Sequence, residues 1–287
     1  MASRNAIFRS QRRINRTMDA VAYAIVGVIT VFAFFPLAWT LLTSFKLEED
    51  IVTEKMQYVP EAVTFDNYVT LWQRSEFPRL MANSAVTTVL TVVICMTFGA
   101  LAAYSISRYR FRGRSFLLVF YLVIRMFPFV LLLVPLFIML RELHLLDSRV
   151  GLALAYTAFL LPVAVWMLKG FFDAIPPELE DASRVDGSTR LGALVRIVLP
   201  LARPGIIATA VFVAIAAWNE FLFALLLTSS AGSRTWPVGL QLMVGEFQLP
   251  WGLLSAGGII SILPIIVFFA FVQRSLVRGL TAGGLKG

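Results

Sequence analysis

Long apolar runs constrain this chain more than any other feature of its sequence. A helix needs about 20 mostly apolar residues to cross a hydrocarbon core of roughly 30 Å. Only 15% of the residues are charged, whereas about 25% is typical of soluble domains. The sequence therefore predicts an all-α integral membrane protein with six transmembrane helices. The predicted spans cover residues 21–45, 83–107, 115–140, 151–168, 205–227 and 253–272.

The distribution of basic residues predicts the orientation. Six spans put both termini on one side, together with the turn 108–114 and the polar stretch 169–204. These four segments hold 17 of the 25 Lys and Arg residues, and the three opposite loops hold 7. Cytoplasmic loops carry the excess of Lys and Arg, so both termini are predicted to be cytoplasmic. Because the bases cluster at the ends of apolar runs, the net charge of +8 does not indicate a nucleic-acid partner.

Four segments describe the predicted organisation. A cytoplasmic basic tail comes first, and the first transmembrane helix with its external loop follows. A membrane domain that includes the cytoplasmic loop 169–204, and then a cytoplasmic C-terminal tail, complete the chain. In order, these segments are 1–19, 20–78, 79–272 and 273–287.

Residues for catalysis are scarce. The single cysteine, Cys95, lies in an apolar run and cannot form an intrachain disulfide. With one His and one Cys, a classical zinc site is not expected. The chain contains no Gly-x-x-x-x-Gly-Lys-Ser/Thr phosphate-binding loop. We therefore expect no enzyme, no metal and no cofactor in this chain. A secondary transporter or channel is one candidate function for such a chain, but no inverted repeat of the kind that such transporters carry is visible.

The polar stretch 169–204 predicts two short helices outside the membrane. Pro176 and Pro177 suit a helix start, since a missing N–H costs nothing in the first turn. Glu180 and Arg184 have the i, i+4 spacing of a stabilising ion pair. Gly187 can end the first helix in a left-handed conformation.

An apolar stripe predicts the second of these helices. It comprises Leu191, Leu194, Val195 and Val198, and Pro200 and Pro204 are expected to end the helix. From the residues alone, the stretch could be an amphipathic loop on the membrane surface or a docking site for a partner.

A resemblance favours the docking site. Glu180-Asp181-Ala182, then Asp186-Gly187, then Ile197-Val198-Leu199-Pro200 resembles the EAA signature of permease subunits of bacterial ABC importers. Asp181 stands for the middle Ala of the signature, and Ser188 for another Ala. In that family the segment forms a coupling helix that docks into a cleft on the cytoplasmic ATPase. The resemblance assigns ATPase coupling to Glu180, Asp181, Ala182, Asp186, Gly187, Ile197, Leu199 and Pro200.

Other segments resemble the MalG-like permeases of carbohydrate uptake systems. The family's C-terminal tail reaches between the ATPase subunits, which implicates Thr281, Gly283, Gly284 and Lys286. Its last outer loop touches the sugar-binding protein, which implicates Trp236, Pro237 and Gly239. Thr64-Phe65-Asp66-Asn67-Tyr68 and Ala217-Trp218-Asn219-Glu220-Phe221 are also familiar segments of that family.

The resemblance implies a type I ABC importer permease fold in a bacterial plasma membrane. It implies pairing with a second homologous permease, two ATPase subunits that bind ATP and Mg, and an external solute-binding protein. The implied substrate is a sugar or oligosaccharide, moved by alternating access.

Charged residues within the spans are candidates for the substrate pathway. Such residues are costly in lipid and usually face a bundle interior or an aqueous cavity. Arg125 either pairs with a carboxylate such as Glu220, or faces the pathway and binds an anionic or hydroxyl-rich solute. Tyr121, Asn219 and Glu220 itself are the other candidates.

Overall fold

The computed structural model is helical in all its regular structure over the part of the chain that it describes. That part comprises residues 2–53, 58, 60, 62–74, 76–126, 128–245 and 249–283. The structure describes the helical backbone, and not the side chains, of residues 2–16, 74, 122, 125, 129, 271–272 and 274–283.

Four of the described helices are long and apolar enough to cross a membrane by themselves. A fifth candidate consists of two helical stretches, 190–201 and 203–218, that meet at an angle of 82°. The four are α1 (Ala2–Ser44, apolar over Thr17–Ser44), α4 (Phe77–Arg108), α7 (Arg149–Asp173) and α14 (Trp251–Gly283, apolar over Trp251–Ala270). These helices agree with four of the predicted spans.

The predicted span 115–140 is broken rather than continuous. It consists of α5 (Arg114–Met126), a 3-10 turn η1 (Phe129–Leu132) and α6 (Leu133–Glu142). Pro128 precedes η1 in an extended conformation, with ψ of 110°. Proline lacks the N–H that would continue the helix, and it disfavours helical geometry in the residue before it. Pro135 lies in the first turn of α6 and leaves that helix intact.

The predicted span 205–227 is also interrupted. Helix α11 (Arg203–Trp218) ends before Asn219, and the short helix α12 (Leu222–Leu227) follows Phe221. The six predicted spans thus correspond to four long helices and two interrupted segments.

The chain divides into two compact units. The first contains residues 1–71 and 249–259, and the second contains 72–248 and 260–287.

In the first unit, the loop after α1 is held by α3 (Asp66–Arg74). The Asn67 amide donates to the carbonyls of Ser44 and Lys46 at 3.0 and 2.8 Å. The Tyr68 hydroxyl lies 2.8 Å from that of Ser44. These contacts give the Thr64–Tyr68 segment a structural role at the end of α1.

A carboxylate caps the start of α14 in the same unit. Glu48, in the short helix α2 (Glu48–Ile51), accepts hydrogen bonds from the backbone N–H groups of Trp251 and Gly252 at 2.7 and 2.9 Å. An acceptor with negative charge at a helix N-terminus satisfies otherwise unpaired donors.

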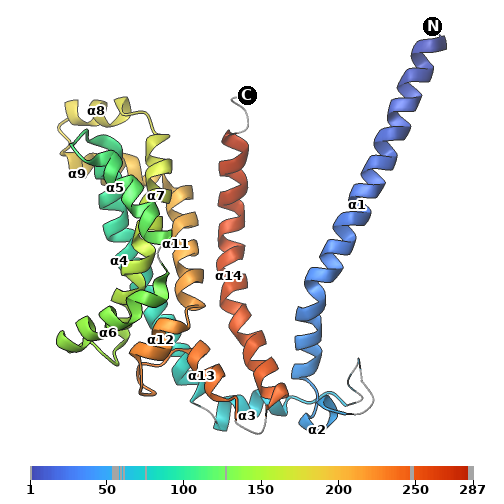
Figure 1. Ribbon diagram of the computed structural model, residues 1–287. Coiled ribbons are helices and arrows are strands. Elements are labelled where there is room, and N and C mark those ends of the chain that lie inside the picture. Colours follow the sequence, from blue (N-terminus) through green and yellow to red (C-terminus); the bar gives the residue numbers. More distant parts are fainter. Residues whose placement is uncertain are drawn as a thin grey trace. The chain divides into compact units, whose positions relative to one another are not determined.

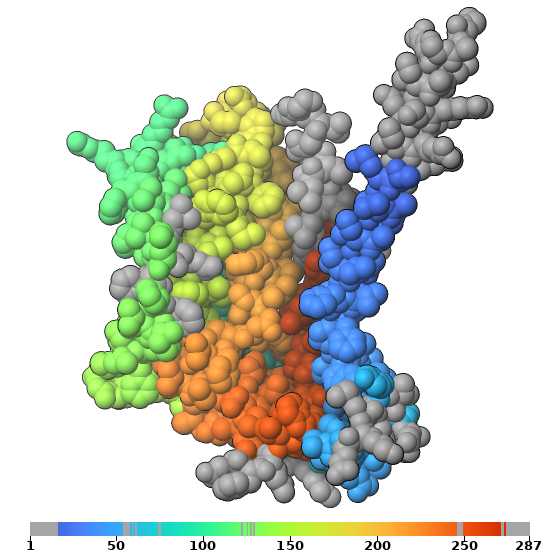
Figure 2. Space-filling model, turned by 45° about the vertical axis from the view of Figure 1, so that its right-hand side comes forward, coloured from blue at the N-terminus to red at the C-terminus, as the bar shows by residue number. Residues whose placement is uncertain are grey.

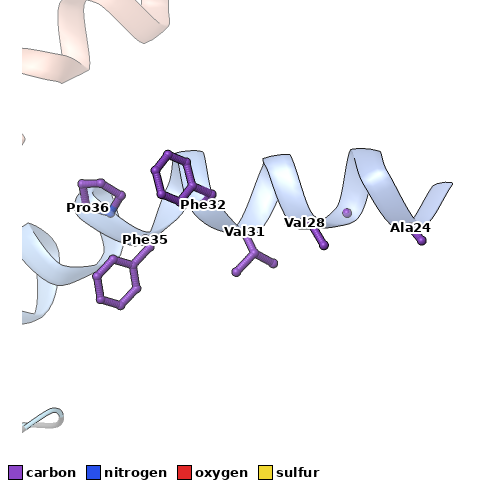
Figure 3. A pocket seen from close by; sticks show the side chains of 7 residues that line it. Ala24, Val28, Val31, Phe32, Phe35 and Pro36 are labelled. Atoms are coloured by element: carbon purple, nitrogen blue, oxygen red, sulfur yellow. The ribbon is translucent and has the colours of Figure 1, made fainter. Parts of the chain in front are cut away.

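None of the most apolar window of α1 is buried. One face carries a shallow apolar pocket of about 560 Å³, whose lining residues appear in Figure 3. Helices with this character need lipid or another apolar helix around them.

In the second unit, α4 packs along α7 and α11 over two buried apolar clusters. Gly205 at the start of α11 allows a close approach to α7, because a Cβ there would lie 2.1 Å from the Phe171 ring. At Gly99 in α4 the packing is looser, since a Cβ there would meet Ala164 at an ordinary 3.5 Å.

Candidate functional site

The first helix of the predicted coupling segment is α8 (Glu178–Val185). It follows Pro176-Pro177, as predicted, and lies across one end of the bundle of α4, α7 and α11 (Figure 1). Gly187 ends it with φ of +90°, the left-handed conformation that its position predicts. The Ser188 N–H donates to the Ser183 carbonyl at 3.0 Å, which closes the turn.

Glu180 faces inward, and it is the only buried residue of α8. Its Oε1 accepts from Arg108 Nε at 2.5 Å, and its Oε2 accepts from the Tyr104 hydroxyl at 2.7 Å. The expected pair with Arg184 is not formed. Arg184 contacts Asp181 instead, at 3.1 Å and i, i+3 spacing. The reason is geometric, since two residues of α4 occupy both carboxylate oxygens of Glu180.

The outward face of α8 carries Glu178, Asp181, Ala182 and Val185, which are all exposed. Val185 is an apolar side chain that is 89% exposed. In Figure 2 the yellow residues around α8 lie at the upper edge of the second unit. Asp181 and Ala182 therefore stand where a partner can reach them, whereas Glu180 does not.

The second half of the segment begins at Thr189, whose hydroxyl accepts from the Gly192 N–H at 3.0 Å. It runs through α9 (Arg190–Ala193), a π-helical turn η2 (Leu194–Val198) and α10 (Leu199–Leu201). The predicted apolar stripe is only half correct. Leu194 and Val198 are buried, but Leu191 and Val195 are 61% and 54% exposed. The wider π-helical turn moves residues out of the α-helical register on which the stripe was based.

The remaining predicted coupling residues differ in exposure. Asp186, Gly187 and Pro200 are exposed, and Ile197 and Leu199 are half-buried.

A polar pocket of about 270 Å³ lies beneath α8. Its lining includes Arg108, Glu180 and Arg190, and the Arg190 guanidinium stacks 5.2 Å from the centre of the Tyr109 ring. The basic turn that served to predict orientation thus also supplies groups that hold α8.

The substrate-pathway candidates Asn219 and Glu220 lie in the break between α11 and α12. Glu220 accepts from the N–H groups of Phe223 and Ala224 at 2.9 and 3.2 Å, so its carboxylate caps α12. Asn219 is exposed. Tyr121 is half-buried in α5, and the Arg125 side chain lies outside the described residues, although its backbone belongs to α5.

The outer-loop candidates are mostly turned inward. Trp236, the first residue of α13 (Trp236–Leu242), is 1% exposed. Its backbone N–H donates to the Ser84 hydroxyl at 2.7 Å. Gly239 is buried, and a Cβ there would lie 2.4 Å from Leu80. Both residues pack against α4, which leaves the half-exposed Pro237 as the member of this set that can meet a partner. The expectation of direct contact therefore does not fit Trp236 and Gly239.

Sequence reasoning did not predict a group of hydrogen bonds around Asp147, at the same end of the second unit. Asp147 accepts from the N–H groups of Ser229 and Ser230 at 2.8 and 2.9 Å, and from the Ser233 hydroxyl. Burial alone would raise the pKa of this carboxyl, but the hydrogen bonds from the three serines hold that pKa well below its usual value. An Asp flanked by short loops gave no signal for this long-range contact.

Two of the predicted tail residues, Thr281 and Gly283, belong to the helical backbone of α14, and their side chains are not described. Gly284 and Lys286 lie outside the described residues. Within the described residues, no group of three or more His, Cys, Asp or Glu side chains could hold a metal ion.

Comparison with known proteins gives the family. The family described as binding-protein-dependent transport system inner membrane component matches residues 95–282. The sulfoquinovosyl glycerol transport system permease protein SmoH of Agrobacterium fabrum is 39% identical over 91% of this chain and 92% of that protein. The trehalose/maltose transport system permease protein MalG of Thermococcus litoralis is 36% identical over 92% of this chain and 96% of that protein.

A solved structure confirms the predicted fold. A chain of a bacterial ABC transporter involved in the import of the acidic polysaccharide alginate superposes with a TM-score of 0.78 at 23% identity, over 91% of this chain and 97% of that one. The chain therefore belongs to the inner membrane components of binding-protein-dependent transport systems, the permease subunits of ABC importers.

Proposed function

We propose that this chain forms half of the translocation pathway of a carbohydrate importer, together with a second, homologous permease. Support comes from relatives named for trehalose, maltose and sulfoquinovosyl glycerol transport. A similar transporter was solved in complex with an alginate pentasaccharide-bound periplasmic protein. By analogy, an external binding protein delivers the solute to this chain, with Pro237 in the contact surface.

The α8 end of the bundle is the proposed docking site for a cytoplasmic ATPase. The observation that carries this proposal is the two-sided character of α8. Its inner residue Glu180 is fixed to α4, and its outer residues, including Asp181 and Val185, are free to meet a partner. The excess of Lys and Arg on this side favours a cytoplasmic location for α8 and both termini.

Two partner ATPase subunits would bind ATP and Mg²⁺ and supply the energy. Their closure would move α8 and open the pathway outward. The C-terminal residues Thr281, Gly283, Gly284 and Lys286 would reach the ATPases as a second contact.

The break between α11 and α12 is the proposed position of the pathway in this subunit. Non-helical backbone at membrane depth is tolerated where protein buries it or where it lines a water-filled cavity. Asn219 is exposed at this break, and Glu220 holds its geometry by capping α12. An anionic solute would find its counter-charge in Arg125. Unchanged transport of the substrate by intact Arg125→Ala complexes would remove Arg125 from the pathway.

Affinity purification of the tagged chain, followed by uptake assays in proteoliposomes, tests the proposal. We expect two ATPase subunits and a second permease to co-purify. Radiolabelled trehalose, maltose and alginate oligosaccharides serve as probes, with the binding protein outside. Uptake of one of them should require ATP. Uptake that needs an ion gradient and proceeds without any ATPase would instead identify a secondary transporter.

A further inference from the structure

Two side chains of α4 hold helix α8 in the segment that connects α7 to α11. We propose that Arg108, Tyr104 and Glu180 form a rigid joint, which makes α8 move as one body with α4. This inference rests on the proposed function, in which an ATPase docks on α8. In that setting the three residues act as positioning residues that pass motion from the docking surface to the membrane-spanning helices.

Arg108 is the centre of the joint. Its Nε donates to Glu180 in α8 at 2.5 Å, and its Nη2 donates to the carbonyl of Ile175 in the α7–α8 linker at 3.0 Å. Its Nη1 donates to the hydroxyl of Ser107 at 3.2 Å. A planar guanidinium can make these three contacts in fixed directions, whereas a lysine ammonium provides one flexible point charge.

Tyr104, one helical turn earlier in α4, completes the joint. Its hydroxyl donates to the second oxygen of Glu180 at 2.7 Å and approaches the carbonyl of Arg190 in α9 at 3.4 Å. The Glu180 carboxylate is therefore held through both of its oxygens. The Glu180 side chain is only 7% exposed and that of Arg108 only 12%, so water cannot easily replace either partner.

The remaining contacts of α8 explain why this joint matters. Glu180 is the one buried residue of α8, so no apolar side chain of that helix anchors it in the core. The following α9–α10 region differs, because Leu194 and Val198 belong to a buried apolar cluster with residues of α4 and α7. Helix α8 also contacts α9 and η2, but the Glu180 carboxylate is its direct side-chain link to α4. A force applied to the outer face of α8 therefore reaches α4 directly through this carboxylate.

A reporter of pathway opening tests the joint without knowledge of the solute. The chain carries one cysteine, Cys95, so a Cys95→Ala/Asn219→Cys chain has a single, exposed thiol. In the complex with its ATPases, the rate of maleimide labelling is measured with and without ATP and vanadate. Co-purification of the ATPases and the rate of ATP hydrolysis are measured on the same samples. The variants are Glu180→Gln, Arg108→Lys and Tyr104→Phe, and Glu142→Gln is the matched control in an exposed ion pair on α6.

We expect Glu180→Gln and Arg108→Lys to reduce the nucleotide-dependent change in labelling at least about tenfold, since each leaves a buried charge without its partner geometry. ATPase association should persist, because the outer face of α8 is unchanged. Tyr104→Phe should have a smaller effect, and Glu142→Gln none. The Arg108→Glu/Glu180→Arg exchange should recover part of the change that Glu180→Arg alone abolishes.

Two results would overturn the inference. One is a wild-type labelling response in both Glu180→Gln and Arg108→Lys. The other is loss of the ATPases from every joint variant, which would make the residues supports of the docking surface rather than transmitters of motion. A parent reporter chain that binds ATPases but shows no nucleotide response would instead contradict the proposed function.

Discussion

Substitution of Gly187 gives the sharpest local test of the coupling segment. Its φ of +90° lies in the region that L-residues avoid, and a Cβ there would meet no heavy atom within 4 Å. The cost of Gly187→Ala is therefore backbone strain without a steric clash, about 1–2 kcal/mol. If the native turn is required for docking, the affinity for the ATPase should fall by about 5–30-fold.

Titration of the purified permease pair with its ATPase, followed by pull-down, measures this affinity. Gly187→Asn should bind better than Gly187→Ala, because Asn tolerates positive φ more readily. Gly170→Ala is the matched control, since Gly170 lies in α7 with equally open space around it. Alanine favours a helix over glycine by up to about 1 kcal/mol, so this control should bind normally. Equal affinity of Gly187→Ala and wild type would refute the requirement for the left-handed turn.

Three further substitutions test the account elsewhere. Gly205→Ala should cost about 1–3 kcal/mol or more through its clash with Phe171, seen as a lower midpoint of thermal unfolding in detergent, whereas Gly170→Ala should not lower it. Asp147→Asn should lower stability by about 1–2 kcal/mol at neutral pH, as charged hydrogen bonds become neutral ones. Because the pKa of Asp147 is depressed in the fold, its contribution is complete above the ordinary value of about 3.9 and is lost as pH falls below it. The wild type should therefore lose more stability than Asp147→Asn between pH 5 and pH 2. Glu220→Gln should destabilise by about 0.5–2 kcal/mol through loss of the charged cap on α12, and an unchanged unfolding midpoint would contradict that role.

The elements that sequence predicted well depend on local chemistry. Apolar length located α1, α4, α7 and α14. The proline pair and Gly187 located both ends of α8, because each residue restricts or permits backbone conformations irrespective of its surroundings.

The features that sequence missed depend on contacts between distant segments. Glu180 pairs with Arg108, 72 residues earlier, rather than with its helical neighbour. Asp147 binds serines more than 80 residues later. The resemblance implicated Trp236 in contact with the binding protein, but nothing in the sequence indicated that its ring packs edge-on to Phe77 at 4.6 Å between centres. Such partners follow from helix packing, which periodicity along one segment does not reveal.

Site-directed cross-linking at α8 tests the central claim most directly. A Val185→Cys chain in the Cys95→Ala background would be treated, within its purified complex, with a thiol–amine cross-linker. Leu143→Cys, a 58% exposed apolar position at the opposite end of the second unit, is the control. We predict that Val185→Cys cross-links to an ATPase subunit and that Leu143→Cys does not. An assembled complex in which Leu143→Cys, and not Val185→Cys, cross-links to the ATPase would contradict α8 as the coupling helix.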